Sequence, residues 1–288
     1  MNGTIAFVGF GEAGQAFATG WSRSVGQVAA FDIKTDTSQT RAAMEARYAA
    51  AGVTGADRIE AALDGAERVF CLVTADCALE AARAGAGSVA PGTLWFDGNS
   101  CAPDTKRAAA EVIEGAGGRY VDMAIMAPVA GKKHRVPILL SGPHADVALS
   151  ALTALDMQVR VVGDTVGQAS SIKMIRSVMI KGIEALTAEC FLSARRAGVG
   201  AEVLGSFEAS DPGMEWPSRA AYNFERMMVH GKRRAAEMRE VAKTVEALGL
   251  GGGMAAATAA WQDRVADTQA NPSGDDLWQE VDRVLNRL

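Results

Sequence analysis

TIAFVGFGEAGQA, residues 4–16, decides the fold of this chain. A short apolar strand runs into the pattern G-x-G-x-x-G, formed by Gly9, Gly11 and Gly14, and a helix of small residues follows. Gly9 permits the tight turn, Gly11 has no Cβ and lets a pyrophosphate approach the backbone, and Gly14 lets the helix pack against the strand. The start of such a helix offers free N–H groups and partial positive charge. The stretch therefore predicts a dinucleotide-binding βαβ unit. Its expected cofactor contacts are Gly9, Phe10, Gly11, Glu12, Ala13 and Gly14.

A second predicted strand, Val28–Phe31, ends at an acidic residue, Asp32. Asp32 stands near the spacing expected of a carboxylate that accepts hydrogen bonds from the ribose hydroxyls. A carboxylate there repels a 2′-phosphate, so we expect NAD as the cofactor. Lys34 and Thr35 lie just beyond it and leave NADP open. The alternative, a glycine-rich turn and a surface aspartate, is disfavoured because the motif has its strand-to-helix context.

Composition limits the classes of function. The chain has 288 residues, 49% of them hydrophobic, with a net charge of −5, which suits one large or two ordinary domains and offers no basic surface for nucleic acid. No apolar run is as long as a membrane span, and the first residues enter a strand without a basic leader, so we expect a cytoplasmic protein with no membrane partner. The four cysteines match no zinc spacing, so we expect free thiols and no metal.

Residues 1–163 alternate between predicted strands and helices. Beyond the first βαβ unit, we expect strands at Arg68–Val73, Thr93–Phe96, Arg119–Asp122, Val136–Gly142 and Val159–Val162, and helices at Thr37–Ala51, Ala78–Ala84, Pro103–Gly115 and Ala145–Leu155. This alternation predicts an α/β, Rossmann-type, doubly wound sheet that is mainly parallel.

Residues 164–288 lack strand patterns and predict an all-helical domain. Gln168 to Gly198 is apolar on nearly every face, which is typical of a buried helix. Further helices are expected at Ala201–Glu208, Pro217–Val229, Lys232–Leu248, Met254–Ala266 and Gly274–Arg287. So small a domain does not cover a long apolar helix by itself, so we expect a homodimer through the helical domain, with Met254–Trp261 as one contact.

Lys173 is the strongest candidate for a catalytic group. It lies early on the apolar helix, and Arg176 and Ser177 share its face at positions i+3 and i+4. A lysine in apolar surroundings pairs with an acid, extends its amine to water or faces a cleft. Beside a nicotinamide, such a lysine acts as a general acid/base on an alcohol. On periodicity alone, an extended lysine or an internal salt bridge stays open.

Polar residues follow two of the predicted strands at the edge where doubly wound sheets bind ligands. Asn99 and Ser100 follow the strand that ends at Phe96, and we expect them to position the reacting groups. Val73 and Thr74 end another strand and are expected to line the cofactor. Capping of the following helices is the alternative for these segments. The basic loop Lys132–Arg135 and His230 either meet an anionic substrate or form solvated surface.

In this combination the chain resembles the β-hydroxyacid dehydrogenase superfamily, which includes 3-hydroxyisobutyrate and 6-phosphogluconate dehydrogenases. The resemblance covers the whole chain in order. It is carried by Gly9–Gly14, Asp97–Ser100, Tyr120–Asp122, Ile138–Gly142 and Gly167–Lys173. It implies that Lys173 is the family's catalytic lysine. The C-terminal half, with Arg234, Glu237 and Met238, is similar to a bacterial branch whose helical domain has no settled function.

The chain departs from the family at two places. The family usually has Ser-Gly-Gly where this chain has Met126, Ala127 and Pro128, so the usual anchor for a substrate carboxylate is missing. The family usually has asparagine where Ser177 stands. Met126 and Pro128 indicate a roomier, more apolar pocket, while Arg176 leaves an acidic substrate open.

We therefore expect an NAD(P)-dependent dehydrogenase that acts on a hydroxy acid or related secondary alcohol, with Lys173 as general acid/base. The substrate is expected to bind between the two domains. Three alternatives remain: an imine reductase, an oxidative decarboxylase on the same scaffold, and a dinucleotide-binding sensor without turnover.

Overall fold

The computed structural model describes residues 3–21, 25–274 and 276–288. The chain divides into two compact units, Met1–Met174 and Ile175–Leu288, which are described separately below. The division falls within one long helix, α7 (Gln168–Arg196). The boundary that we predict from the sequence, between residues 163 and 164, follows the last strand and stays a prediction.

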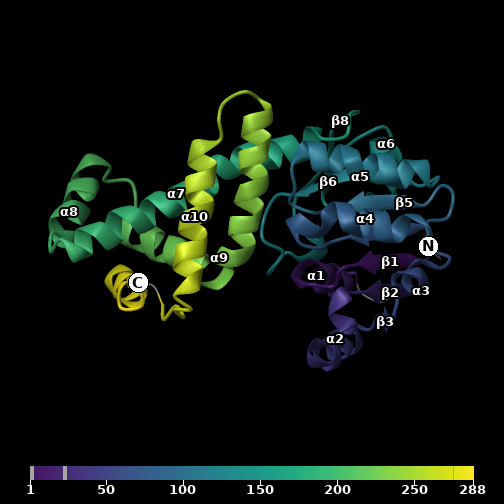
Figure 1. Ribbon diagram of the computed structural model, residues 1–288, viewed down its shortest axis with the longest axis horizontal. Helices are drawn as coiled ribbons and strands as arrows, with labels where there is room; N and C mark the ends of the chain where they lie inside the picture. The colour runs from purple at the N-terminus through teal and green to yellow at the C-terminus, as the bar shows by residue number, and fades with distance from the viewer. Residues whose placement is uncertain (1–2, 22–24, 275) are drawn as a thin grey trace. The chain divides into compact units, whose positions relative to one another are not determined.

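The first unit is built on one eight-stranded sheet in the order β3-β2-β1-β4-β5-β6-β7-β8 (Figure 1). The strands are β1 Ile5–Val8, β2 Val28–Phe31, β3 Thr54–Gly55, β4 Arg68–Cys71, β5 Leu94–Asp97, β6 Arg119–Ile125, β7 Ile138–Ser141 and β8 Val159–Gly163. The first six are parallel to their neighbours, β7 runs antiparallel to β6, and β8 is parallel to β7. The doubly wound, mainly parallel sheet is therefore confirmed. Its strand order reverses between β1 and β4, which is where such sheets bind ligands.

Helices cover both faces of this sheet because side chains alternate along its strands. Ile5 and Phe7 of β1 pack with Phe17, whereas Ala6 and Val8 pack with Ile113 in a second cluster. The helical segments are α1 Glu12–Gly20, η2 Ile33–Thr35, α2 Ser38–Ala51, α3 Ile59–Leu63, η3 Ala75–Cys77, α4 Ala78–Ala86, α5 Pro103–Gly115, η4 Lys133–Arg135 and α6 Ala145–Thr153. The helix predicted after the glycine loop and the four further predicted helices of this half are all present, and α5 has the predicted bounds.

The second unit is helical throughout its described residues. After α7 come α8 Gly200–Ser210, α9 Trp216–Ala247, α10 Gly253–Asp267 and α11 Leu277–Leu285. Their apolar side chains form one core, which includes Phe191, Phe224, Met227, Val265 and Val281. Two largely buried ion pairs join α7 to α9, one between Glu184 and Arg234 and one between Lys181 and Glu237.

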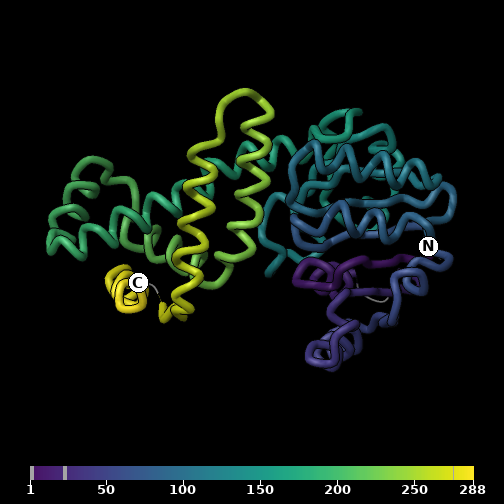
Figure 2. Tube along the Cα trace, viewed as in Figure 1, coloured from purple at the N-terminus to yellow at the C-terminus, as the bar shows by residue number. Residues whose placement is uncertain are grey.

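The prediction of two helices between Pro217 and Leu248 is wrong, because α9 runs through both segments without a break (Figures 1 and 2). Gly231 lies between the two predicted segments, and a glycine at that position suggests the end of a helix. A Cβ at Gly231 would lie 2.6 Å from the backbone oxygen of Gln262 in α10. This glycine therefore permits close packing of α9 against α10. It does not end a helix.

The last helix is shorter than predicted. It begins after Asp276, whose carboxylate accepts a hydrogen bond from the backbone N–H of Gln279 and so caps the helix. Asp275, within the predicted segment Gly274–Arg287, lies outside the described residues.

Helix α7 is covered on one side only within a single chain. Met174 and Phe191 are buried, but Ile175, Met179 and Leu186 are 50%, 64% and 55% exposed. A helix apolar on nearly every face thus keeps an apolar stripe uncovered in one chain. Among the helices of the described residues, none combines the length and apolar character needed to cross a membrane.

Candidate functional site

The glycine loop between β1 and α1 has the geometry of a phosphate cradle. Gly9 has a φ of +84°, and a Cβ there would lie 2.6 Å from the backbone oxygen of Leu72, so both conformation and space require glycine. Gly11 is the N-cap of α1, no side chain caps this helix start, and a Cβ on Gly11 would meet nothing within 4 Å. Open space at an uncapped helix N-terminus fits a pyrophosphate. A Cβ at Gly14 would lie 3.0 Å from the ring of Phe10, so this glycine serves close packing.

Asp32 links the end of β2 to the glycine loop. Its Oδ2 accepts a hydrogen bond from the backbone N–H of Phe10 at 2.8 Å, and its Oδ1 accepts one from the backbone N–H of Lys34 at 3.0 Å. The Phe10 side chain is buried against Tyr48, while Glu12 is exposed and Ala13 half-buried. Asp32 therefore fixes the backbone of the glycine loop, in addition to its predicted role as the ligand of the ribose.

Tyr48 is a residue of this region that the sequence did not single out. The centroid of its ring lies 5.3 Å from that of Phe10, the second residue of the loop. Burial, and after it the charge of Asp32, raise the pKa of Tyr48 to about 12, so the phenol is neutral. A neutral phenol adds no charge beside the Asp32 carboxylate.

The carboxyl ends of β4 and β5 meet beside the glycine loop. The Oδ1 of Asn99 accepts a hydrogen bond from the backbone N–H of Val73 at 2.7 Å, and its Nδ2 donates one to Asp97 Oδ1 at 2.7 Å. Val73 itself adjoins Gly9. Asn99 is buried, Ser100 is half-buried and Thr74 is exposed. The structure thus brings Gly9, Val73 and Asn99 together at one rim and gives Asn99 a role in holding that rim.

Asp122, at the carboxyl half of β6, fixes the start of α7. Its Oδ2 accepts hydrogen bonds from the backbone N–H groups of Gly167 and Ser170 at 3.1 and 3.0 Å, and from the Ser170 hydroxyl at 3.1 Å. A carboxylate at this position satisfies N–H groups that a helix start leaves without partners. Lys173 follows Ser170 by three residues and is half-buried. The predicted catalytic lysine is therefore carried by a firmly capped helix start.

The predicted substrate segment follows β6. Met126 packs against a small cluster that contains Ala169, at the start of α7. Ala127 is half-buried and Pro128 is exposed. Within the first unit, this apolar segment and the start of the lysine-bearing helix are therefore neighbours.

The remaining predicted site residues, Arg176, Ser177 and His230, belong to the second unit. Ser177 is buried and its hydroxyl accepts a hydrogen bond from Lys181 Nζ at 3.2 Å. Arg176 is exposed and His230 half-buried. Their roles stay predictions.

The basic loop is tied to a neighbouring acid. Arg135 is hydrogen-bonded to Asp156, with its Nε 2.9 Å from Oδ2. His134 is buried beside Gly20, and burial lowers its pKa, so this side chain is neutral at pH 7. Only part of the positive charge that the sequence suggests is thus available to an anion.

Sequence reasoning missed Lys106, which is fully buried. A signal for it was present. On α5 it shares the buried face with Pro103, Ala109, Ala110 and Ile113, at helical spacing, so a charge occupies a core position. Such a position requires a buried partner.

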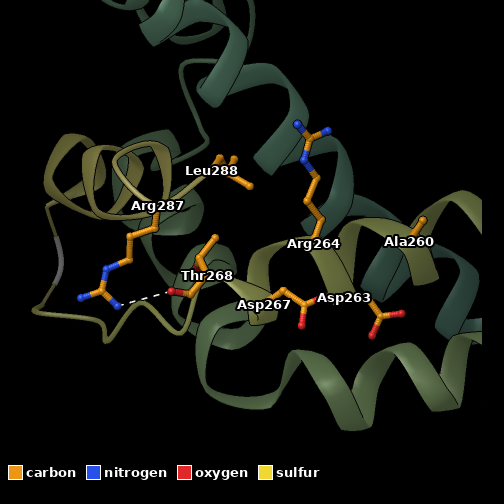
Figure 3. Close-up of a pocket in the computed structure, with 7 residues that line it drawn as sticks. All are labelled: Ala260, Asp263, Arg264, Asp267, Thr268, Arg287 and Leu288. Carbon is orange, nitrogen blue, oxygen red and sulfur yellow. Dashed lines mark hydrogen bonds between the residues drawn. The ribbon is translucent and has the colours of Figure 1, made fainter.

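A surface cavity of about 530 Å³ in the second unit contains none of the predicted site residues (Figure 3). Its lining includes Asp263 and Asp267 of α10, and both acids are ion-paired with Lys232. The cavity is open to one side, and its acidic groups are satisfied by surface cations.

Two family models match the chain. Residues 4–162 match the NAD binding domain of 6-phosphogluconate dehydrogenase. Residues 194–265 match a domain of unknown function, DUF1932. The first match contains the glycine loop, Asp32, Asn99 and Asp122.

Solved structures share the fold over the whole length. A conserved hypothetical protein from Sinorhizobium meliloti 1021 is 38% identical, with a TM-score of 0.75 and coverage of 100% of this chain and 97% of that one. MTH1747, a conserved protein of unknown function with structural similarity to 3-hydroxyacid dehydrogenases, is 30% identical, with a TM-score of 0.68 and coverage of 92% and 97%. The 3-hydroxyisobutyrate dehydrogenase of Mycobacterium tuberculosis shares the fold at 18% identity, with a TM-score of 0.72 and coverage of 98% and 99%.

An uncharacterized 28.5 kDa protein of Methanothermus fervidus is 28% identical over 152 residues, which are 53% of this chain and 58% of that protein. The family model of residues 4–162 and the similarity to MTH1747 confirm the resemblance to hydroxyacid dehydrogenases that the motifs carry. The chain belongs to the family defined by the NAD-binding domain of 6-phosphogluconate dehydrogenase, and residues 4–162 are that domain.

Proposed function

We propose that this protein transfers a hydride between NAD and a hydroxy acid or a related secondary alcohol, with Lys173 as the general acid/base. One observation carries the proposal. The open, uncapped α1 start at Gly11 and the capped α7 start that bears Lys173 belong to the same compact unit. A dinucleotide site and a proton-transferring amine are the two groups that such a reaction requires.

NAD is the proposed cofactor because the segment after β2 favours the free ribose. Asp32 is followed by Ile33, which is exposed and apolar, and Asp36 lies nearby. Arg41, a cation of the following helix, is already paired with Asp57 at 2.8 Å. Lys34 is the remaining cation in this stretch. The balance of these charges disfavours a 2′-phosphate.

The chain supplies binding, orientation and proton transfer. A bound dinucleotide would supply the hydride acceptor. The N–H groups at the start of α1 would hold its phosphates, and Asp32 would hold its ribose. Lys173 Nζ takes the proton of the substrate hydroxyl as the carbonyl forms, and returns it in the reverse reaction.

The substrate pocket is proposed to be apolar on the side of β6. Met126 and Ala127 offer no hydroxyl group, and Met126 packs against the start of α7. This segment also favours a second candidate, reduction of an imine, because an imine lacks the carboxylate that the family's usual anchor binds. Arg176 is the group that we propose for an acidic substrate.

A substrate panel tests the proposal. Purified protein is assayed with NAD and NADP on small hydroxy acids and secondary alcohols, with carbon dioxide release measured in parallel. In the reductive direction it is assayed with NADH and NADPH on cyclic imines. We expect hydroxyl oxidation with NAD and its loss in Lys173→Met. Turnover of imines alone would replace the proposal by the second candidate. Tight dinucleotide binding without any turnover would replace it by a sensor.

A further inference from the structure

Lys106 occupies the centre of a buried cluster between β5, β6 and α5. Its Nζ donates hydrogen bonds to the backbone oxygen of Asp97 at 2.6 Å and to Asp97 Oδ1 at 2.9 Å. The same ammonium group lies 3.6 Å from Asp122 Oδ1. All three side chains are at most 1% exposed. A lysine with no access to water therefore stands between two carboxylates.

The two carboxylates serve different parts of the candidate site. Asp97 Oδ1 accepts hydrogen bonds from the backbone N–H and the Nδ2 of Asn99, at 3.0 and 2.7 Å, and Asn99 in turn binds the backbone of Val73. Asp122 uses its other oxygen, Oδ2, to cap the start of α7. Lys106 is thus the link between the rim beside the glycine loop and the helix start that bears Lys173.

The ammonium group of Lys106 balances the charges of the two buried carboxylates. Tyr120 donates a hydrogen bond to Asp97 Oδ2 at 2.6 Å and is itself neutral, since burial and then Asp97 raise its pKa well above the usual value. The ammonium group of Lys106 is therefore the counter-charge that the structure shows in contact with both acids. Two buried carboxylates so close together repel each other without an intervening cation. Removal of the cation should loosen both of the segments that the acids hold.

We propose that Lys106 is a positioning residue of the candidate active site, which bridges Asp97 and Asp122 and thereby keeps the Asn99 rim and the Lys173 helix start in one fixed arrangement. Lys106 touches neither cofactor nor substrate in this role. It acts through Asn99 on one side and through Ser170 on the other. Its effect on turnover rests on the proposed function of Lys173, whereas its effect on the two segments does not.

Hydrogen exchange resolved by residue or short peptide tests the bridge without any substrate. Lys106→Met removes the charge and keeps an unbranched side chain, and Lys106→Gln is the second variant in case the first does not fold. Arg83→Met, which removes an exposed cation paired with Glu80 on α4, is the matched control. We expect exchange at Val73 and at Gly167–Ser170 to rise at least about tenfold in the Lys106 variants, as for the loss of a buried polar contact. Exchange in β1, which opens only with the whole unit, should rise by no more than the global loss of unfolding free energy accounts for, and both segments should stay unchanged in the control.

Kinetics supply the second readout. We expect kcat to fall at least about tenfold, because small displacements of catalytic groups are costly, while KM for the dinucleotide stays near that of the wild type. Uniform acceleration of exchange over the whole first unit would show a general stabilising role and overturn the proposal. Unchanged exchange at either segment would overturn it too. If the wild type turns over no compound of the panel, the proposed function fails, and exchange alone decides whether Lys106 bridges the two segments.

Discussion

The backbone N–H of Phe10 donates a 2.8 Å hydrogen bond to Asp32 Oδ2, across 22 positions of sequence. The second residue of the glycine loop is thereby fixed to the end of the neighbouring strand. Because Asp32 also holds the backbone N–H of Lys34, one carboxylate organises both segments that are predicted to surround the dinucleotide.

Replacement of Asp32 should reduce stability and cofactor selectivity together. Asp32→Ala leaves the buried N–H of Phe10 without its acceptor, which costs about 1–3 kcal/mol of unfolding free energy. It also removes the repulsion of a 2′-phosphate. We therefore expect kcat/KM with NAD to fall, and the ratio of kcat/KM with NADP to kcat/KM with NAD to rise. Asp36→Ala, at an exposed acid four residues on, is the control for charge alone. A wild type that strongly prefers NADP would refute the role assigned to Asp32.

Gly9 and Gly11 should respond to alanine in opposite ways. Gly9→Ala places a Cβ 2.6 Å from a backbone oxygen at a φ of +84°, so we expect a marked loss of thermal stability. Gly11→Ala meets open space, so its melting temperature should stay near that of the wild type while dinucleotide affinity falls, because the added methyl group occupies the phosphate approach. Calorimetry and dinucleotide titration separate the two effects. Equal affinity of Gly11→Ala and the wild type would show that phosphates do not bind over Gly11.

We propose that the protein is a homodimer through its helical unit. The exposed stripe of Ile175, Met179 and Leu186 on α7 is the surface that requires cover. Met179→Glu should therefore convert the dimer to a monomer in light scattering at micromolar concentration. Val147→Glu, at an exposed apolar residue of α6, should leave the dimer intact. A wild type with the mass of one chain would contradict the proposal.

Alkaline pH tests the buried charge of Lys106. Burial alone would lower its pKa, but the neighbouring groups, Asp97 foremost and Asp122 among them, outweigh burial and raise the pKa above the usual 10.5. A raised folded-state pKa contributes stability in full below the unfolded value and loses it as pH rises through the folded value. The difference in unfolding free energy between wild type and Lys106→Met, about 3–5 kcal/mol for a broken buried pair, should be constant up to about pH 9 and shrink above about pH 10.5. A difference that grows with pH in urea titrations would refute this assignment.

The first unit was predictable because its signals are local. The G-x-G-x-x-G motif has its strand and helix beside it, and the alternation of elements limits the topology. The antiparallel direction of β7 was not evident, because strand direction depends on pairing partners far along the chain. The single helix α9 was missed because a glycine such as Gly231 suggests the end of a helix. In the structure, Gly231 instead permits close packing of α9 against α10.

The candidate site was predictable only in part. Motif spacing predicts Asp32, whereas Lys173 is predicted from its place on an apolar helix together with the family resemblance. The partners of Asn99 and Lys106 lie in other segments of the chain, 26 positions away for Val73 and nine for Asp97, and no local pattern pairs them. The sequence does show that Lys106 is a charged residue on the buried face of α5. It does not show the partners of this charge, because they are acids of β5 and β6.

Turnover of Lys173→Met and Lys173→Arg against the wild type tests the central claim most directly. Methionine removes the amine, and arginine keeps the charge but does not exchange a proton in the accessible pH range. We predict that both variants lose about 10²–10⁴ in kcat, as for a missing general acid/base, while dinucleotide affinity stays within a few fold of the wild type. A Lys173→Arg variant with wild-type turnover, or a Lys173→Met variant that keeps more than about a tenth of it, would contradict the account.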